Sequence, residues 1–258
     1  MRNKKSKIDS ALADAKSCMR SDPERASKLA DWAFKESQLN QYLKGQADAL
    51  SIFASLYIES SPSTGHDFAL KATELYRKVS DEASAAAALM IVARYYEKSG
   101  WTARSHYVLL EAYELATESN DAHIRATALF NLGANAEDRN DFVVALDYFS
   151  CAKLTAEESG EDLVYYRAVC AEQEMHYLLR DGNFDLQKVD DAADSLAARG
   201  METSLLEIKL FLSKVSFDQQ DFRAARANLK QAYAMANSVQ DERHENLVDR
   251  TKLWKGKV

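Results

Sequence analysis

A pattern of small and apolar residues recurs every 40 residues along this chain and constrains its fold more than any other feature. Each copy has members at offsets 0, 4, 7 and 11, which lie along one face of a helix of about 3.6 residues per turn. A fixed period of roughly 20 to 50 residues is typical of stacked structural repeats. The clear copies are Ser105, Leu109, Ala112 and Ala116, then Ala145, Phe149, Ala152 and Ala156, and two periods later Ala225, Leu229, Ala232 and Ala236; Val189, Ala192 and Leu196 keep the register of a degenerate copy that departs at Asp185.

The composition favours a chain built only from helices. It has eight glycines, two prolines and 28% charged residues, and no stretch combines period-two alternation with turn residues at hairpin spacing. The sequence therefore predicts an all-α solenoid over residues 1–258, a single domain made of about six helix hairpins and a C-terminal capping helix. The expected hairpins cover residues 6–40, 45–80, 82–120, 122–160, 162–200 and 203–240, and the last helix covers residues 241–258.

Helix boundaries are marked by capping residues and glycines. Ser21-Asp22-Pro23-Glu24 combines a capping side chain with a proline that fits a first helical turn. Residues 60–65 are expected to form the longest loop, between helices 45–59 and 67–78. Most other glycines fall at expected helix ends, and Asp181-Gly182-Asn183 is expected to be a turn before a helix at Phe184. In the last helix, Leu247, Val248, Thr251 and Trp254 share a face that is expected to pack near Leu229 and Tyr233.

Charge and cysteine usage predict the compartment and exclude some partners. The net charge is −7, but residues 1–7 and 250–258 hold eight basic residues and no acids, which leaves 25 basic against 40 acidic residues in the body. An acidic body repels phosphate backbones, so nucleic acid is not an expected partner. The basic ends fit solubility or a helix C-terminus, with a nucleic-acid or lipid tail as the alternative.

No signal peptide or membrane span is expected. The basic start at residues 1–7 is not followed by an apolar run, and no uncharged stretch reaches the roughly 18 residues that span a bilayer. Cys18, Cys151 and Cys170 are isolated in helical segments, as small core residues of a reducing compartment would be. The sequence therefore predicts a cytoplasmic protein without a membrane partner.

No catalytic, cofactor or metal site is expected. The five histidines show no ligand spacing to one another or to cysteine, and the phosphate-loop, dinucleotide and nucleophile-elbow motifs are missing. Carboxylate pairs such as Glu157-Glu158 and Asp190-Asp191 lie on expected solvent faces. The prediction is no enzyme activity and no bound cofactor.

The fourth hairpin resembles a tetratricopeptide repeat, in Asn131-Leu132-Gly133 followed by Asp141-Phe142, Ala145, Phe149 and Ala152. That family's period is about 34 residues, so the spacing of 40 resembles the extended variant found in bacterial regulators and sensor solenoids. The resemblance implies a right-handed superhelix whose first helices line a concave groove. It also implies that the groove binds a protein or peptide.

The resemblance places candidate partner-binding residues on the groove side of the first helices. By position, Asn131 matches an asparagine that bonds an extended peptide's backbone in some members, a role suited to an amide that both donates and accepts. The lining is largely apolar, which favours an amphipathic helix or a hydrophobic peptide. Alternatively, these apolar residues pack between repeats and fill the groove. The candidates are Ser55, Met90, Arg94, Glu97, Phe130, Asn131, Lys214 and Phe217.

A polar interruption stands in the expected helix 162–180. Glu172, Gln173, Glu174 and His176 break an apolar run from Leu163 to Leu179. Two interpretations stay open: a polar notch in the groove, or a helix with a wide solvent-exposed polar face.

Two functions fit these observations. The first is a non-catalytic protein- or peptide-binding scaffold in bacterial-type signalling. The second is the N-terminal sensory domain of a longer protein, such as a diguanylate cyclase, a histidine kinase or a transcription regulator. The pattern selects no oligomeric state.

Overall fold

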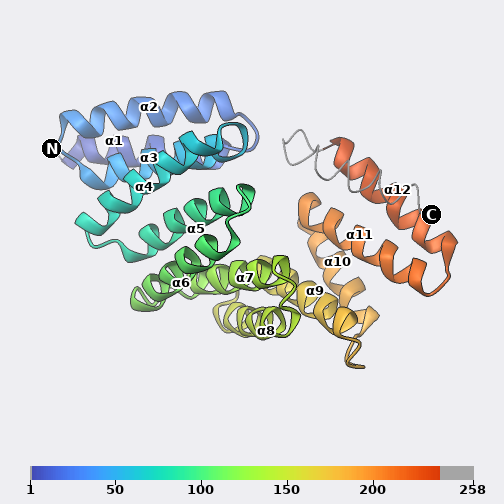
Figure 1. The fold of residues 1–258 in the computed structure, drawn as a ribbon. Helices are drawn as coiled ribbons and strands as arrows, with labels where there is room; N and C mark the ends of the chain where they lie inside the picture. Colours follow the sequence, from blue (N-terminus) through green and yellow to red (C-terminus); the bar gives the residue numbers. More distant parts are fainter. Residues whose placement is uncertain (1, 239–258) are drawn as a thin grey trace. The chain divides into compact units, whose positions relative to one another are not determined.

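The described chain is entirely helical, as the sequence predicts (Figure 1). The structure is a computed structural model that describes residues 2–238, so the expected helix 241–258 and its contacts lie outside the described residues. In the described range there are twelve helices and no strand. They are α1 (Arg2–Cys18), α2 (Pro23–Leu39), α3 (Leu43–Ser60), α4 (Pro62–Lys78), α5 (Glu82–Lys98), α6 (Thr102–Glu118), α7 (Ala122–Asp138), α8 (Phe142–Ser159), α9 (Asp162–Leu179), α10 (Leu186–Ala198), α11 (Glu202–Asp218) and α12 (Phe222–Ser238).

The chain divides into two compact units. Unit 1 is Met1–Asn140 and holds α1 to α7, and unit 2 is Asp141–Val258 and holds α8 to α12. The division falls between α7 and α8, inside the expected hairpin 122–160. A single domain over residues 1–258 therefore stays a prediction.

Most turns are three residues long and share one backbone geometry. In the turn between α5 and α6, Gly100 has a φ of 74°, the left-handed conformation that ends many helices. Residues other than glycine adopt it at several equivalent turns, because the short connection between antiparallel helices requires it. These residues are Gln41, Ser80, Asn120, Asn140 and Gln220.

The expected loop at residues 60–65 is wrong. Helix α3 continues to Ser60 and α4 begins at Pro62, with Pro62 in the first turn, where its missing N–H costs no hydrogen bond. Gly65 then lies inside α4, and a Cβ atom at this position would stand 2.7 Å from the Ile58 Cα. The glycine is needed for close packing of α4 on α3.

The longest irregular segment in the described range is instead residues 180–185, between α9 and α10. The turn at Asp181-Gly182-Asn183 is present, but α10 begins at Leu186 instead of Phe184. The Asp185 side chain caps the helix by accepting a hydrogen bond from the Gln187 N–H. Asp185 departs from the small-residue pattern because it is a capping residue.

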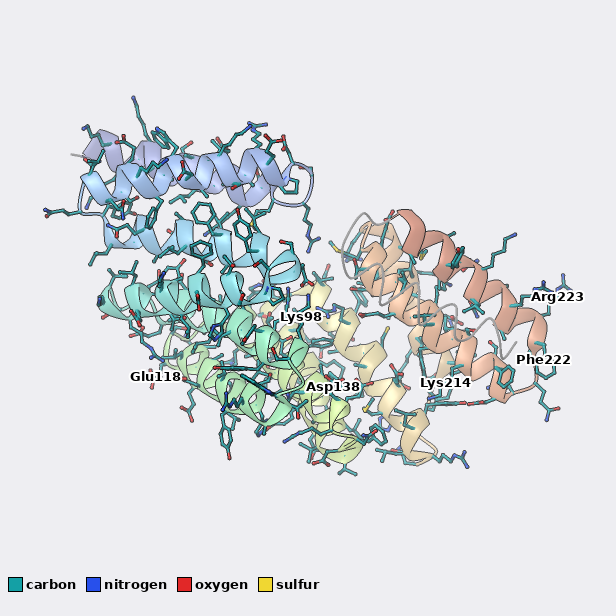
Figure 2. The ribbon with its side chains drawn as sticks, turned by 45° about the horizontal axis from the view of Figure 1, so that its top comes forward. Lys98, Glu118, Asp138, Lys214, Phe222 and Arg223 are labelled. Atoms are coloured by element: carbon teal, nitrogen blue, oxygen red, sulfur yellow. The ribbon has the colours of Figure 1, made fainter. Side chains whose placement is uncertain are left out.

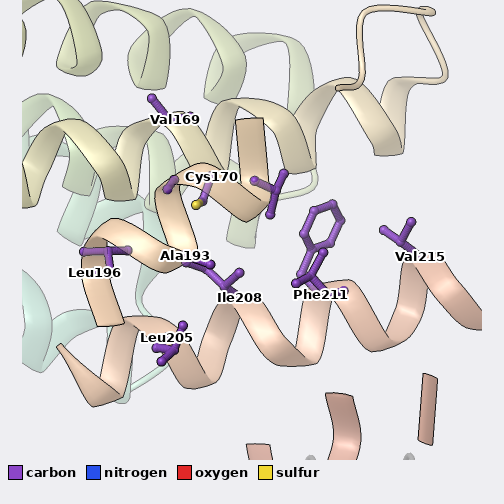
Figure 3. Close-up of a cluster of buried hydrophobic side chains, with 11 residues drawn as sticks. Val169, Cys170, Ala193, Leu196, Leu205, Ile208, Phe211 and Val215 are labelled. Carbon is purple, nitrogen blue, oxygen red and sulfur yellow. The ribbon is translucent and has the colours of Figure 1, made fainter. Parts of the chain in front are cut away.

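The repeated small residues form the contacts between helices. Ser105, Leu109, Ala112 and Ala116 are all buried on α6, and the equivalent residues of α8 and α12 are buried too. A further copy, Gly65, Ala69, Ala72 and Tyr76, lies on α4. It is not predicted from the sequence because its first residue, Gly65, is assigned to the expected loop. In unit 2, residues of α9, α10 and α11 form one apolar cluster (Figure 3). Its members include Val169, Cys170, Val189, Ala193, Leu196, Leu205, Ile208 and Phe211.

The cysteines do not share one environment. All three are free thiols. Cys170 is buried, and burial raises the pKa of its thiol to about 12. Cys151 is exposed and Cys18 half-buried, so the expectation of three core cysteines is wrong for Cys151. It lies on the solvent side of α8, opposite the buried Ala152 stripe.

Candidate functional site

The first helices of the hairpins lie side by side in unit 1. Helix α1 contacts α3, α3 contacts α5, and α5 contacts α7. The second helices α2, α4 and α6 each pack against the first helix that follows them. One side of unit 1 is therefore lined by first helices, as in stacked helical repeats. We call the surface of α3, α5 and α7 that carries Ser55, Met90, Arg94, Phe130 and Asn131 the inner face.

The centre of the inner face is partly filled by its own side chains. The Asn131 Nδ2 donates to the Met90 Sδ at 3.3 Å, which joins α7 to α5. Met90 also packs on the buried cluster that contains Ala86 and Leu89, and Phe130 is half-buried. Met90 therefore packs between repeats, and the Asn131 amide bonds its weakly accepting thioether sulfur; partner binding at these residues stays a prediction.

One end of the inner face carries two cations around a single carboxylate. The Arg94 Nη1 lies 3.6 Å from Glu59 Oε1, and the Lys98 Nζ bonds the other oxygen of the same carboxylate. The Glu59 side chain is only 14% exposed, whereas that of Arg94 is 49% exposed. Arg94 thus presents much of its guanidinium to solvent. Ser55, one turn before Glu59, is exposed, and its hydroxyl donates to the Ser51 carbonyl.

Sequence reasoning missed Glu59 and Lys98. Glu59, Lys98 and Asp138 occupy equivalent positions at the ends of α3, α5 and α7, with alternating charge; Figure 2 marks Lys98 and Asp138 at their helix ends. Their alternating charges could have indicated this ion pair from the sequence, because equivalent residues of stacked repeats lie near one another.

Glu97 is directed toward α6. Its Oε1 accepts a hydrogen bond from the buried Ser105 hydroxyl at 2.8 Å. Burial raises the pKa of its carboxyl above the ordinary value, and Asp138 raises it further, although the Ser105 bond and Arg94 oppose this. Glu97 therefore serves the contact between α5 and α6 more directly than the open surface.

Glu97→Gln is expected to stabilise the protein at neutral pH. A carboxyl whose pKa is raised on folding contributes stability below its unfolded pKa, near 4.5, and this contribution is lost as pH rises through the folded pKa. Glutamine keeps an acceptor for Ser105 without the buried charge. Urea unfolding at pH 7 should show the gain, and the gain should vanish at pH 4. Glu114→Gln on exposed α6 surface is the control, and an equal gain there would contradict the assignment.

Unit 2 places Lys214 and Phe217 beside further aromatic residues. The Lys214 Nζ lies 5.9 Å from the centre of the Tyr177 ring, and the Phe217 ring meets Phe222 edge-on at 5.6 Å. The Tyr177 hydroxyl donates to Asp218, and burial together with Asp218 raises the Tyr177 pKa to about 12. Sequence reasoning missed Tyr177 and Phe222. The channel from Met90 to Lys214 that the repeat implies spans both units and stays a prediction.

Both interpretations of the polar residues in α9 are wrong for Glu172 and Gln173, and they stay predictions for the half-buried Glu174 and His176. Glu172 and Gln173 are buried instead of lining a notch or facing solvent. The Glu172 carboxylate accepts bonds from the Lys153 ammonium at 2.6 and 2.7 Å, so it ties α9 to α8. The Gln173 Oε1 accepts from the Asp185 N–H, and the His176 Nδ1 lies 2.7 Å from Asp181 Oδ2. Gln173 and His176 therefore anchor segment 180–185 to α9.

Across residues 2–238, no three His, Cys, Asp or Glu side chains come together as a metal site requires. No helix in that range is both long enough and apolar enough to cross a membrane.

Known structures share this arrangement of helices. Aspartyl phosphate phosphatase F from Bacillus subtilis is 15% identical, with a TM-score of 0.59 over 82% of this chain and 65% of its own. A Rap protein complexed with competence and sporulation factor is 15% identical, with a TM-score of 0.69 over 96% of this chain and 72% of its own. The fold is a helical repeat solenoid. No protein-family model matches the chain, and no curated protein matches it.

A third similar structure has a tetratricopeptide repeat sensor in its name. It is a signal transduction ATPase from Pyrococcus horikoshii with a tetratricopeptide repeat sensor, 14% identical, with a TM-score of 0.63 over 99% of this chain and 42% of its own. The chain thus spans about two-thirds of the phosphatase and less than half of the ATPase. At these identities the likeness shows the fold.

Proposed function

We propose that this chain is a non-catalytic scaffold that binds a peptide in bacterial-type signalling, with the inner face of unit 1 as its binding surface. The observation that carries the proposal is the pair formed by Asn131 and Met90. A thioether sulfur is a weak acceptor, so the Asn131 amide exchanges it readily for a peptide carbonyl. Met90 is flexible enough to move aside, as methionines at adaptable binding surfaces do.

The surroundings of this pair suit a short peptide. The half-buried Phe130 and Met90 offer apolar contact, and Arg94 offers a guanidinium that is only loosely held by Glu59 at 3.6 Å. One of the similar structures is a Rap protein complexed with competence and sporulation factor, and another is a Rap conjugation gene regulator in complex with the Phr* peptide, which supports a peptide ligand for this fold. Lys214 and Phe217, on the first helix α11 of unit 2, are proposed as further partner-binding residues.

The proposal of a scaffold without catalysis rests on how titratable groups are placed. One similar structure is named a phosphatase, so the fold itself does not decide the matter. Glu97 and Tyr177 have shifted pKa values, but each is paired within the fold, with Ser105 and Asp218 respectively, instead of gathering around a cavity. We further propose a cytoplasmic location without cofactor, nucleic-acid or membrane partners, which the free cysteines and the acidic body support.

A second candidate function is the sensory part of a longer signalling protein. The ATPase from Pyrococcus horikoshii carries a tetratricopeptide repeat sensor, and this chain spans 42% of that protein. In this case the inner face binds the signal, and a separate domain supplies the output. Sequencing the gene on both sides of the segment that encodes residues 1–258 distinguishes the two roles.

The inner face can be tested with a synthetic library of short random peptides. Peptides retained by the purified protein are identified by mass spectrometry, and their affinities are measured by calorimetry. The double variant Arg94→Ala with Asn131→Ala should weaken binding at least about tenfold, since each lost hydrogen bond to a peptide is worth about 1 kcal/mol or more. Its melting temperature should stay close to that of the parent.

A matched control is Arg25→Ala with Gln38→Ala, two exposed residues of α2. This variant should bind as the parent does. Retention of no peptide, or equal affinity in the Arg94 and Asn131 variant, would contradict a binding role for the inner face.

A further inference from the structure

Helix α6 begins with a tryptophan where other hairpins have a capping residue. Trp101 is the N-cap residue and makes no side-chain capping bond. Of the aspartates at the equivalent positions, Asp221 accepts a hydrogen bond from the Ala224 N–H, whereas Asp141 makes no such bond. A missing cap costs about 1 kcal/mol. Trp101 is also 47% exposed, so helix stability does not explain its presence. The indole contacts the Tyr95 and Tyr96 rings but leaves about half of its surface open to a partner.

The exposed indole holds an arginine in place. The Arg104 guanidinium carbon lies 4.5 Å from the centre of the Trp101 ring, a cation–π contact. The Tyr96 ring supports the indole at 5.9 Å. Arg104 is exposed and forms no ion pair with any carboxylate of the described residues, whereas Arg77 on α4 is paired with Glu111. The Arg104 guanidinium is therefore positioned in advance, with its donors open to solvent.

A third side chain extends this surface along α6. Tyr107 is 72% exposed and follows Arg104 by one helical turn. We call Trp101, Arg104 and Tyr107 the α6 patch. A hollow of about 440 Å³ adjoins it, lined by Gly100, Trp101, Thr102, Ala103 and Arg104. Tryptophan, tyrosine and arginine are the residue types that most often dominate the binding energy of protein interfaces.

We propose that the α6 patch docks an acidic segment of a partner protein. A carboxylate of that segment pairs with Arg104, and neighbouring apolar side chains rest on Trp101 and Tyr107. Charge complementarity selects this occupant, because Trp101 holds the Arg104 guanidinium in place and no carboxylate of the described residues pairs with it. The α6 patch is a different surface from the inner face, because its residues lie on α6 and the turn before it and not on α3, α5 or α7.

The test uses the protein with a disabled inner face, so that the two binding surfaces are separated. The variant with Arg94→Ala and Asn131→Ala is exposed to the library of short random peptides. The peptides it retains should be enriched in aspartate and glutamate. Their affinity should fall at least about tenfold when Arg104→Glu is added, and much less with Arg104→Lys, which keeps the charge but loses the planar stacking. Lys71→Glu, an equal charge change on exposed α4 surface, should leave the affinity unchanged.

Trp101→Asp provides a second readout. Aspartate is the residue of the equivalent position 221 and restores a helix cap, so the melting temperature should stay near that of the parent while acidic peptides lose affinity. A tryptophan that only packs against Tyr96 would give the reverse result. The proposal is overturned if no acidic peptides are retained, if Arg104→Glu binds them as before, or if sedimentation shows that the patch joins two copies of the chain. Each outcome is independent of whether the inner face binds a peptide.

Discussion

Gly65→Ala is expected to lower the free energy of unfolding by about 1–2 kcal/mol net, since an overpacking cost of about 2–3 kcal/mol is partly offset by the better helix propensity of alanine. The added Cβ would stand 2.7 Å from both the Cα and the N of Ile58, and 3.1 Å from the Ala54 carbonyl oxygen. All three are backbone atoms of α3, so no side-chain rotation relieves the clash and the helices must separate. The loss outweighs the roughly 1 kcal/mol by which alanine favours a helix over glycine. Urea unfolding followed by circular dichroism measures the change.

Ser63→Ala is the matched control for this prediction. Ser63 lies two residues earlier on α4 and is exposed, so alanine there should be neutral or stabilising by a few tenths of a kcal/mol. If Gly65→Ala were also neutral, the two helices would not approach as closely as the structure places them.

Lys153→Met is expected to cost about 2 kcal/mol. Glu172 is 8% exposed, and loss of the ammonium leaves its carboxylate with one hydrogen-bond partner among the described residues, the Ser150 hydroxyl at 2.8 Å. Removing one partner of a fully buried pair costs about 3–5 kcal/mol. The smaller figure applies because Lys153 is 26% exposed and water reaches it. Thermal and urea unfolding should agree on the loss.

The double replacement Lys153→Met with Glu172→Leu should recover most of that stability, because no buried charge is then left unpaired. Lys28→Met is the control, since Lys28 and Glu24 form an exposed pair on α2 whose loss should be barely measurable. A single variant as stable as the parent would show that Glu172 is hydrated.

The helices were predictable because their pattern is local. The repeated stripe, together with capping residues, places α5, α6 and α7 almost to the residue. The segment around Pro62 could not be predicted in the same way, since Pro-Ser-Thr-Gly is typical of a loop when no neighbour is considered. Only the backbone of Ile58 shows that Gly65 is a packing glycine. Asp185 is a similar case, because its capping role depends on where α10 begins.

The candidate site was predictable in position but not in its contacts. The phase of the repeat places Arg94 and Asn131 on the first helices. Their partners Glu59 and Met90 lie on the neighbouring helix, 35 and 41 residues away, a distance over which side-chain pairing leaves no local pattern. Gln173 shows the same limit. Its polarity is visible in the sequence, but its burial depends on segment 180–185, whose Asp185 N–H donates to the Gln173 side chain.

Glycine substitutions at the left-handed turn residues are a route to a higher melting temperature. Gln41, Ser80 and Gln220 hold φ values of 51°, 53° and 64°, a left-handed conformation that costs a residue with a side chain about 1 kcal/mol or more. Glycine adopts it freely, as Gly100, Gly160 and Gly200 do at equivalent turns. The three positions lie in different turns, far apart in the chain, so gains from each would add. A lineage moving to a hotter habitat could raise the melting point of this solenoid turn by turn without altering any helix face that meets a ligand.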